Sequence, residues 1–223
     1  MNQVITLDGP AGSGKSTISR LLAEKLNFLY LDTGAMYRAV AFQAQRKKID
    51  VNDRETLGTL CLNLDLKFKE DGEISKLFIG DEDISLAIRS SEMDMLSSTI
   101  SAVKEVRIAM TGLQRKFGGK GRLVAEGRDM GTVVFPEADY KFFITASLKE
   151  RAARRYGERK NRGESISRME VENELRERDY QDETRPIAPL RPARDAKMID
   201  TTTLTPEQVL ENIFLSMNRK IIS

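Results

Sequence analysis

The sequence reads Gly9-Pro10-Ala11-Gly12-Ser13-Gly14-Lys15-Ser16 close to its N-terminus. This stretch fits the pattern G-x-x-x-x-G-K-[ST], in which glycines allow successive backbone N–H groups to point at phosphate oxygens. An apolar run at residues 4–7 precedes it and a helix-like run at residues 18–26 follows it, as a phosphate-binding loop (P-loop) requires. The pattern therefore predicts a nucleoside triphosphate site at the positive end of a helix. A glycine-rich turn with a surface lysine is the alternative.

The pattern also assigns parts to individual residues of the loop. Lys15 is expected to reach the β- and γ-phosphates, and the Ser16 hydroxyl to help hold Mg²⁺, the expected cofactor. No other protein ligand of the metal is predicted. The predicted ATP-binding residues are Gly9, Pro10, Ala11, Gly12, Ser13, Gly14, Lys15, Ser16 and Thr17.

The composition excludes several classes of function. The chain has 223 residues, enough for one α/β domain with an insertion. Its 36 basic and 34 acidic residues nearly cancel, so the net charge gives no electrostatic attraction to nucleic acid or to an anionic membrane. The absence of histidine excludes His-based catalysis and most zinc sites. Cys61 is the single cysteine, which forbids an internal disulfide and agrees with a reducing compartment. Without a signal peptide or a long apolar run, we expect a soluble cytoplasmic protein.

Alternating strand and helix patterns predict a parallel α/β core. The fold class expected is a three-layer P-loop α/β fold with a central parallel sheet of about five strands flanked by helices, a small antiparallel β insertion and a helical lid. A long helix is expected from Ser98 to Phe117, and Ser147 with Glu150 predicts a capping box. The expected parallel strands are 3–7, 28–31, 122–126, 140–145 and 198–200. The expected helices include 15–27, about 33–47 and one that begins at Thr205 with Pro206 and Gln208. An antiparallel hairpin is expected at about 64–88, with a third strand near 83–87.

Three polar clusters follow this core pattern. Residues 32–38 and 126–131 each come at the end of a predicted parallel strand, so they share the sheet edge of the P-loop. A hydroxyl at a helix start with an arginine just over one turn later suits a second phosphate, although an ordinary capped helix gives the same pattern. The third cluster, residues 151–194, has eleven arginines and nine acidic residues, of which Arg178, Asp182 and Arg185 share one helical face. Most of these charges are expected on a solvated helix, and the remainder would serve a lid closing over phosphates.

These motifs, in this order, resemble the bacterial cytidylate kinase family, whose members phosphorylate CMP and dCMP with ATP. The resemblance covers essentially the whole chain. It is carried by residues 8–17, 32–38, 127–136, 178–190 and 199–202.

The resemblance implies roles for residues that match the motifs. Thr33, Arg38 and Arg128 would bind the CMP phosphate. Ser98, Arg107 and Asp129 would surround the cytosine, Arg178 and Asp182 would contact the ribose, and Arg185 would reach the transferring phosphate. The expected catalytic residues are Lys15, Arg128, Arg178 and Arg185, and the expected partners are ATP and CMP or dCMP, with the protein a monomer that binds neither nucleic acid nor membrane.

The resemblance also implies a division of the single P-loop kinase domain. The core is expected at about 1–60, 98–150 and 195–223, a nucleoside monophosphate-binding insertion at about 61–97, and a lid at about 151–190. Two other functions remain open. One is a P-loop kinase for UMP, AMP or shikimate, and the other is a nucleotide sensor that binds nucleic acid, against which the balanced charge of the arginine-rich stretch argues.

Overall fold

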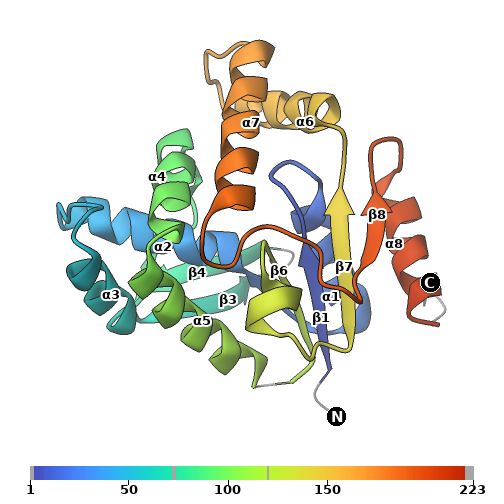
Figure 1. Cartoon of the computed structure of the whole chain (residues 1–223), viewed down its shortest axis with the longest axis horizontal. Helices are drawn as coiled ribbons and strands as arrows, with labels where there is room; N and C mark the ends of the chain where they lie inside the picture. The colour runs from blue at the N-terminus through green and yellow to red at the C-terminus, as the bar shows by residue number, and fades with distance from the viewer. Residues whose placement is uncertain (1–2, 72–73, 120, 219–223) are drawn as a thin grey trace. The chain divides into compact units, whose positions relative to one another are not determined.

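A five-stranded sheet carries the P-loop in the computed structural model, which describes residues 3–71, 74–119 and 121–218. The strand order is β2-β6-β1-β7-β8, and β1 pairs in parallel with β6 and β7, as β7 does with β8 (Figure 1). The predicted fold class and all five predicted strands are confirmed. The strands are β1 (Val4–Asp8), β2 (Leu29–Asp32), β6 (Leu123–Gly127), β7 (Tyr140–Thr145) and β8 (Lys197–Asp200).

The chain separates into two compact units. The first contains the described residues of Met1–Leu31 and Lys120–Ser223, and the second is Asp32–Gly119. The second unit includes the whole of the predicted insertion and extends beyond it at both ends. Four of the five sheet strands lie wholly in the first unit together with the P-loop, and β2 lies there except for its last residue, Asp32.

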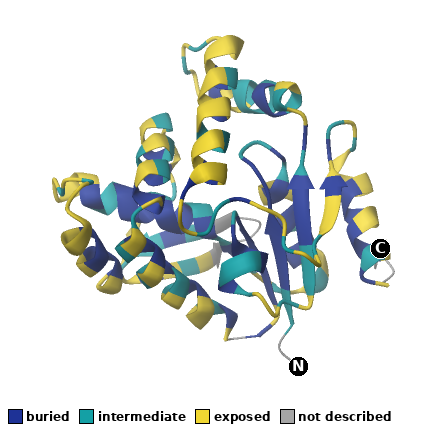
Figure 2. Cartoon of the chain, viewed as in Figure 1, coloured by how far each residue is buried: buried dark blue, intermediate teal, exposed yellow. Residues whose placement is uncertain are grey.

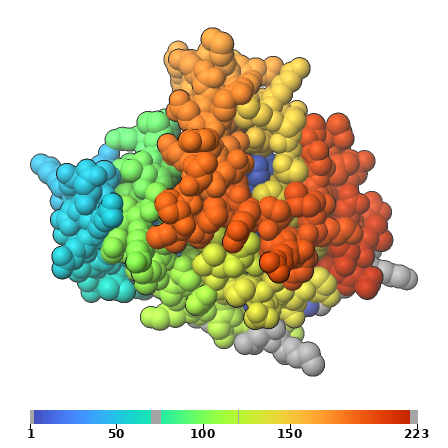
Figure 3. All heavy atoms as spheres, viewed as in Figure 1, coloured from blue at the N-terminus to red at the C-terminus, as the bar shows by residue number. Residues whose placement is uncertain are grey.

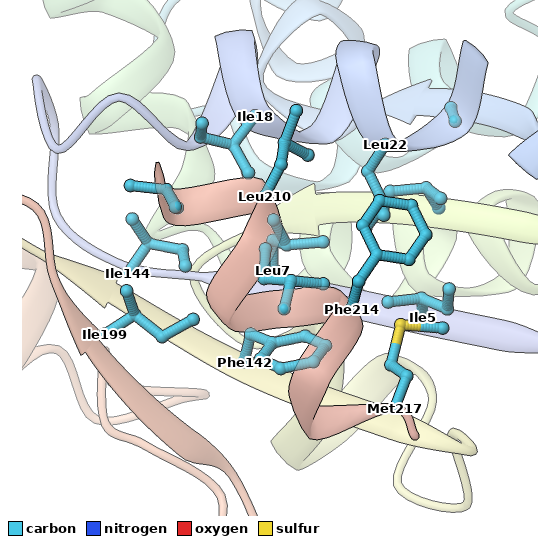
Figure 4. Close-up of a cluster of buried hydrophobic side chains, with 14 residues drawn as sticks. Ile5, Leu7, Ile18, Leu22, Phe142, Ile144, Ile199, Leu210, Phe214 and Met217 are labelled. Carbon is cyan, nitrogen blue, oxygen red and sulfur yellow. The ribbon is translucent and has the colours of Figure 1, made fainter. Parts of the chain in front are cut away.

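The main hydrophobic core of the first unit lies between the sheet and two helices. Side chains of α1 (Lys15–Leu26) and α8 (Pro206–Ser216) meet those of β1, β6, β7 and β8 in this cluster (Figure 4). Ile5, Leu7 and Ile144 are wholly buried, and full burial of such a side chain stabilises the fold by about 1.5–3 kcal/mol. Both faces of β1 are covered, as the dark strands in Figure 2 show, which explains its continuous apolar run.

The start of α8 matches its sequence signals. The Thr205 hydroxyl accepts from the Gln208 backbone N–H, the Gln208 side chain accepts from the Thr205 N–H, and Pro206 occupies the first helical position. The capping box predicted at Ser147 is only half formed. The Ser147 hydroxyl caps α6 (Leu148–Asn161), but the Glu150 carboxylate accepts from Arg154 Nε at 3.0 Å instead, because a charged partner lies one turn away.

Helices α6 and α7 (Arg168–Thr184) pack on each other within the arginine-rich stretch. A small cluster of Ala152, Val171 and Leu175 joins them, and Arg159 pairs with two carboxylates, Glu164 at 2.6 Å and Glu174 at 2.5 Å. Much of the visible surface of α7 is exposed (Figure 2). The two helices thus form a helical hairpin with its own small core.

The second unit combines helices with a three-stranded sheet of order β3-β4-β5. The antiparallel hairpin is confirmed, but the third strand lies at Glu82–Asp83, and Ala87–Arg89 forms a 3₁₀ turn instead. Residues 72 and 73 of the predicted hairpin turn lie outside the described residues. The elements are α2 (Thr33–Arg46), α3 (Arg54–Leu62), β3 (Leu66–Asp71), β4 (Ile74–Ile79), β5 (Glu82–Asp83), α4 (Ser91–Ser101) and α5 (Lys104–Gly118).

The long helix predicted from Ser98 to Phe117 is wrong. The chain forms two helices, α4 and α5, with extended backbone at Val103 between them. In the last turn of α4, the Ser101 hydroxyl donates to the Ser98 carbonyl. The Ser101 carbonyl in turn accepts from Arg107 Nη1, in α5, at 3.1 Å. A tertiary contact therefore stabilises the break. No helix among the described residues is long and apolar enough to cross a membrane.

Candidate active site

The P-loop joins β1 to α1 and depends on backbone conformations that only glycine adopts easily. Gly9, Gly12 and Gly14 have φ values of 153°, 75° and 85°. A Cβ on Gly9 would lie 2.0 Å from the Ile144 carbonyl oxygen, so the loop approaches β7 too closely for any side chain. Gly14 caps α1 without a side-chain hydrogen bond, which leaves the first N–H groups of the helix for an anion.

Lys15 opens α1 and is almost fully buried. Its Nζ donates to the Pro10 carbonyl at 3.0 Å, within the P-loop itself. Burial lowers the pKa of Lys15 to about 7, helped by the positive charges of Arg128 and Arg178 and opposed by the carboxylates of Glu126 and Asp182. The two carboxylates therefore do not offset the burial of the ammonium group, and phosphates would supply the further negative charge that it needs.

Ser16 and Glu126 form the part of the site that suits a metal ion. The exposed Ser16 donates its hydroxyl to Glu126 Oε2 at 2.9 Å, and Tyr30 donates to Glu126 Oε1 at 2.5 Å. The described residues contain no group of three His, Cys, Asp or Glu able to hold a metal. Mg²⁺ bound to a nucleotide needs no such group, because phosphates and water supply most of its ligands. A hydroxyl beside a carboxylate at the P-loop therefore fits Mg²⁺.

Arginines and carboxylates form a buried network beyond the end of β6. Arg128 Nε donates to Asp182 Oδ2 at 2.7 Å, and Arg185 lies 3.5 Å from both Asp182 Oδ1 and Asp129 Oδ1. Burial acts to raise the pKa of Asp182, but the charges of Arg128 and Arg178 outweigh it and hold the pKa below its usual value. Asp182 is thus a charged partner shared by two arginines.

Arg178 and Asp182 lie within α7, and Arg185 caps the end of that helix. The predicted common face is therefore present, and it brings these three residues to Arg128 and Asp129, which follow β6. The blue loop after β1 lies beside α7 in Figure 1. In Figure 3, dark-blue atoms of the N-terminal part of the chain are visible between the yellow and orange atoms of later segments.

Two arginines that the sequence analysis did not single out also contact the P-loop. Arg151 Nη1 donates to the Ala11 carbonyl at 3.1 Å, and its Nη2 pairs with Asp179 at 2.7 Å. Arg154 donates to the Thr201 hydroxyl at 3.0 Å and to the Ser13 carbonyl at 3.5 Å. Both lie in the arginine-rich stretch, whose sequence does not rank one arginine above another.

In the second unit, Asp32 organises the start of α2. Its Oδ1 accepts from the Ala35 N–H at 2.8 Å, and its Oδ2 accepts from Arg38 Nη2 at 3.3 Å. Arg38 Nη1 also lies 3.7 Å from Asp94. Thr33, the first residue of α2, is buried. The helix start thus carries a hydroxyl and an arginine held by two carboxylates.

The remaining predicted site residues lie in α4 and α5. Arg107 is 3% exposed, and its guanidinium carbon lies 5.7 Å from the centre of the Tyr37 ring. Ser98 is partly exposed in α4. The second unit therefore holds Thr33, Arg38, Ser98 and Arg107, whereas the first unit holds the P-loop residues and Arg128, Asp129, Arg178, Asp182 and Arg185.

Comparison with known proteins identifies relatives along the whole chain. The family described as cytidylate kinase matches residues 5–219. The chain is 50% identical to the cytidylate kinase of Citrifermentans bemidjiense over 93% of this chain and 89% of the relative. It is 45% identical to that of Carboxydothermus hydrogenoformans, over 97% of each chain, and 42% identical to that of Vibrio cholerae, over 98% of this chain and 97% of the relative.

Among solved structures, an uncharacterised protein from Eubacterium ventriosum covers 98% of this chain and 99% of its own, with a TM-score of 0.53 and 11% identity. This likeness shows a common fold. The sequence matches, which extend over both units, show that the chain belongs to the cytidylate kinase family.

Proposed function

We propose that this chain transfers the γ-phosphoryl group of Mg·ATP in line to CMP and dCMP, giving CDP and dCDP. The activity is that of its family. The observation that carries the proposal for this chain is the buried P-loop Lys15 beside the charges of Arg128, Arg178 and Asp182. Phosphoryl transfer needs positioning and positive charge more than a protein nucleophile.

ATP binds through the P-loop, residues 9–17, in this proposal. The uncapped start of α1 donates backbone N–H groups, and Lys15 contacts the β- and γ-phosphates. The Ser16 hydroxyl, which donates to Glu126 Oε2, would be the protein ligand that holds Mg²⁺, and the Glu126 carboxylate beside it would orient that ligand. Bound Mg²⁺ neutralises charge that develops on the phosphate oxygens.

CMP takes its phosphate contacts from Thr33, Arg38 and Arg128. Arg178 and Asp182 contact the ribose, and Ser98 and Arg107 contribute to cytosine binding with Asp129. The attacking oxygen belongs to CMP, so no residue serves as the nucleophile. Lys15, Arg128, Arg178 and Arg185 stabilise the transferring phosphoryl group, which would otherwise repel a second anionic substrate.

Asp129 selects cytosine over uracil in this scheme. Its carboxylate is buried and accepts a hydrogen bond from the exocyclic amine of cytosine, whereas uracil presents a carbonyl oxygen there. The α6–α7 hairpin, within about residues 151–190, acts as the lid that excludes water once both nucleotides are bound. The monomeric state and the cytoplasmic location stay predictions.

The test is ADP release from Mg·ATP with CMP, dCMP, UMP, AMP and shikimate offered separately. We expect turnover with CMP and dCMP well above that with the other acceptors. Asp129→Ala should lower the preference for CMP over UMP far more than the affinity for ATP. Equal loss of both would remove Asp129 from cytosine recognition, and RNA binding with steep salt dependence but no acceptor-dependent turnover would favour a nucleotide sensor.

A further inference from the structure

Asp8, the last residue of β1, makes two hydrogen bonds to a turn far along the chain. Its Oδ1 accepts from the Met130 N–H and its Oδ2 from the Gly131 N–H, each at 2.8 Å. The side chain is 3% exposed. Burial raises the pKa of Asp8 to about 6, against the lowering effect of these two hydrogen bonds. Both carboxylate oxygens are thus committed to backbone donors, which leaves Asp8 unsuited to act as a base.

The two amides belong to the first residues of a short π-helical turn, Met130–Val134, whose capping position is Asp129. An aspartate in that position usually caps its own turn through its carboxylate. Asp129 makes no such bond, and its Oδ1 instead lies 3.5 Å from Arg185 Nη2. Asp8, on another strand, therefore accepts from the first two amides of the turn, including the Gly131 N–H that an Asp129 cap would take.

Close packing holds this turn against β1. A Cβ on Gly131 would lie 3.0 Å from Thr6 Oγ1 and 3.4 Å from Asp8 Oδ2. The absence of a side chain at Gly131 lets the backbone amides come within hydrogen-bond distance of Asp8. π-Helical turns of this kind occur frequently at functional sites.

We infer that Asp8 is a positioning residue for substrate selection: by capping the 130–134 turn in place of Asp129, it keeps the Asp129 carboxylate directed away from its own backbone and toward the cytosine. The inference rests on the proposed role of Asp129. Without the Asp8 carboxylate, the Gly131 N–H loses its side-chain acceptor, and the Asp129 carboxylate can accept from it as an N-cap side chain does. Asp129 then caps its own turn and no longer accepts from cytosine.

Asp8→Asn tests this mechanism with little change of volume. An amide oxygen accepts from only one of the two N–H groups, and the amide NH₂ faces the other. We expect the ratio of kcat/KM for CMP to that for UMP to fall about tenfold or more, the scale of losing a hydrogen bond to a charged group. Loss of folded protein alone lowers turnover with both substrates in proportion and leaves the ratio unchanged.

Asp139→Asn is the matched control. The Asp139 carboxylate accepts from the Val4 N–H at 2.8 Å, so it makes the same kind of bond at the other end of β1. This variant should keep the wild-type ratio of CMP to UMP. Should Asp139→Asn lower the ratio as much as Asp8→Asn does, the effect would be a general consequence of loosening β1, and the inference would be overturned.

The double variant Asp8→Asn/Asp129→Ala separates this inference from the proposed function. If Asp8 acts through Asp129, its ratio should equal that of Asp129→Ala alone, because the carboxylate to be positioned is gone. A ratio unchanged by Asp8→Asn but lowered by Asp129→Ala overturns the inference and leaves the proposed function standing. A ratio unchanged by Asp129→Ala overturns the role of Asp129, and the inference with it.

If Asp8→Asn does not fold, Gly131→Ala provides the second variant. The added methyl group pushes the turn away from Thr6 and Asp8 while leaving both carboxylates in the chain. We expect a smaller fall in the ratio of CMP to UMP and faster hydrogen exchange at the amides of residues 130 and 131. Faster exchange with an unchanged ratio would overturn the inference.

Discussion

Lys15 illustrates a residue whose function lowers stability. Its ammonium group is buried beside other positive charges, so its pKa falls from an ordinary value of 10.5 to about 7. Between these two pH values the unfolded chain binds more protons at Lys15 than the folded chain does. Stability of the nucleotide-free protein therefore rises with pH in this window, and below about pH 7 the full cost of burying the charge remains.

Lys15→Met should therefore raise the Tm of the nucleotide-free protein by at least about 2 °C at pH 7, the scale of 1 kcal/mol in a chain of this size. The same variant should lose turnover, because the contact to the phosphates is gone. Differential scanning calorimetry checks the Tm, and the gain should shrink at pH 9.5. Lys25→Met, at an exposed position of α1, should leave the Tm unchanged. A lower Tm for Lys15→Met at pH 7 would contradict the buried-charge argument.

Arg185 lies 3.5 Å from the carboxylates of Asp129 and Asp182, yet it is proposed to stabilise the transferring phosphoryl group. Arg185→Ala should lower kcat by about a hundredfold or more, by analogy with arginines that serve other phosphoryl-transfer sites. Steady-state kinetics at saturating ATP and CMP measure this loss. Arg176→Ala, whose side chain is 66% exposed in α7, is the control and should keep its kcat. An unchanged kcat in Arg185→Ala would assign Arg185 a structural role.

Among the elements, the α6–α7 hairpin has a core of its own. Leu175 is 5% exposed and packs with Ala152 and Val171, whereas Met169 on the same helix is 74% exposed. The small size of this cluster suggests that the hairpin opens locally at a lower free energy than the main sheet does.

Leu175→Ala should destabilise the hairpin by about 2–5 kcal/mol, the usual cost of removing a buried leucine side chain. Hydrogen exchange should become faster across α6 and α7 while β1 and β7 keep their protection, and KM for ATP should rise, since Arg151 links this hairpin to the P-loop. Met169→Ala is the matched control and should change neither quantity. Uniformly faster exchange in α6, α7 and the sheet would show that the hairpin unfolds only with the rest of its unit.

At the scale of the whole molecule, substitutions in α8 test how much the main hydrophobic core contributes to stability. Phe214 of α8 is 3% exposed, and α8 joins α1 and four strands in the main core (Figure 4). Phe214→Ala should lower the free energy of unfolding by about 3–5 kcal/mol, because it removes a large side chain from a close-packed core. Its neighbour Leu215 is 66% exposed, and Leu215→Ala should cost less than about 0.5 kcal/mol. Urea unfolding compares the two, and equal losses would contradict the assigned core.

Local signals in the sequence were sufficient for much of this molecule. Glycine spacing and flanking periodicity predicted the P-loop between β1 and α1, and cap residues predicted the start of α8. The common helical face of Arg178, Asp182 and Arg185 also follows from spacing alone. Each of these features depends on residues a few positions apart, whose geometry the backbone fixes.

The remaining features depend on contacts between distant segments. Arg107 stabilises the break before α5 by bonding to the Ser101 carbonyl, and a neighbouring arginine draws Glu150 away from its capping box. Arg151 stands out among eleven arginines only because packing places it on the P-loop.

Taken by itself, the sequence determined the class of fold, the phosphate-binding loop and the residue types from which a nucleotide site is built. Tertiary structure alone decided which charges meet. Asp8 lies 122 positions before Met130, and the parallel pairing of β1 with β6 brings the two together. A carboxylate interacts with whichever donor lies within hydrogen-bond distance, and between segments this far apart that distance is set by packing of the whole sheet.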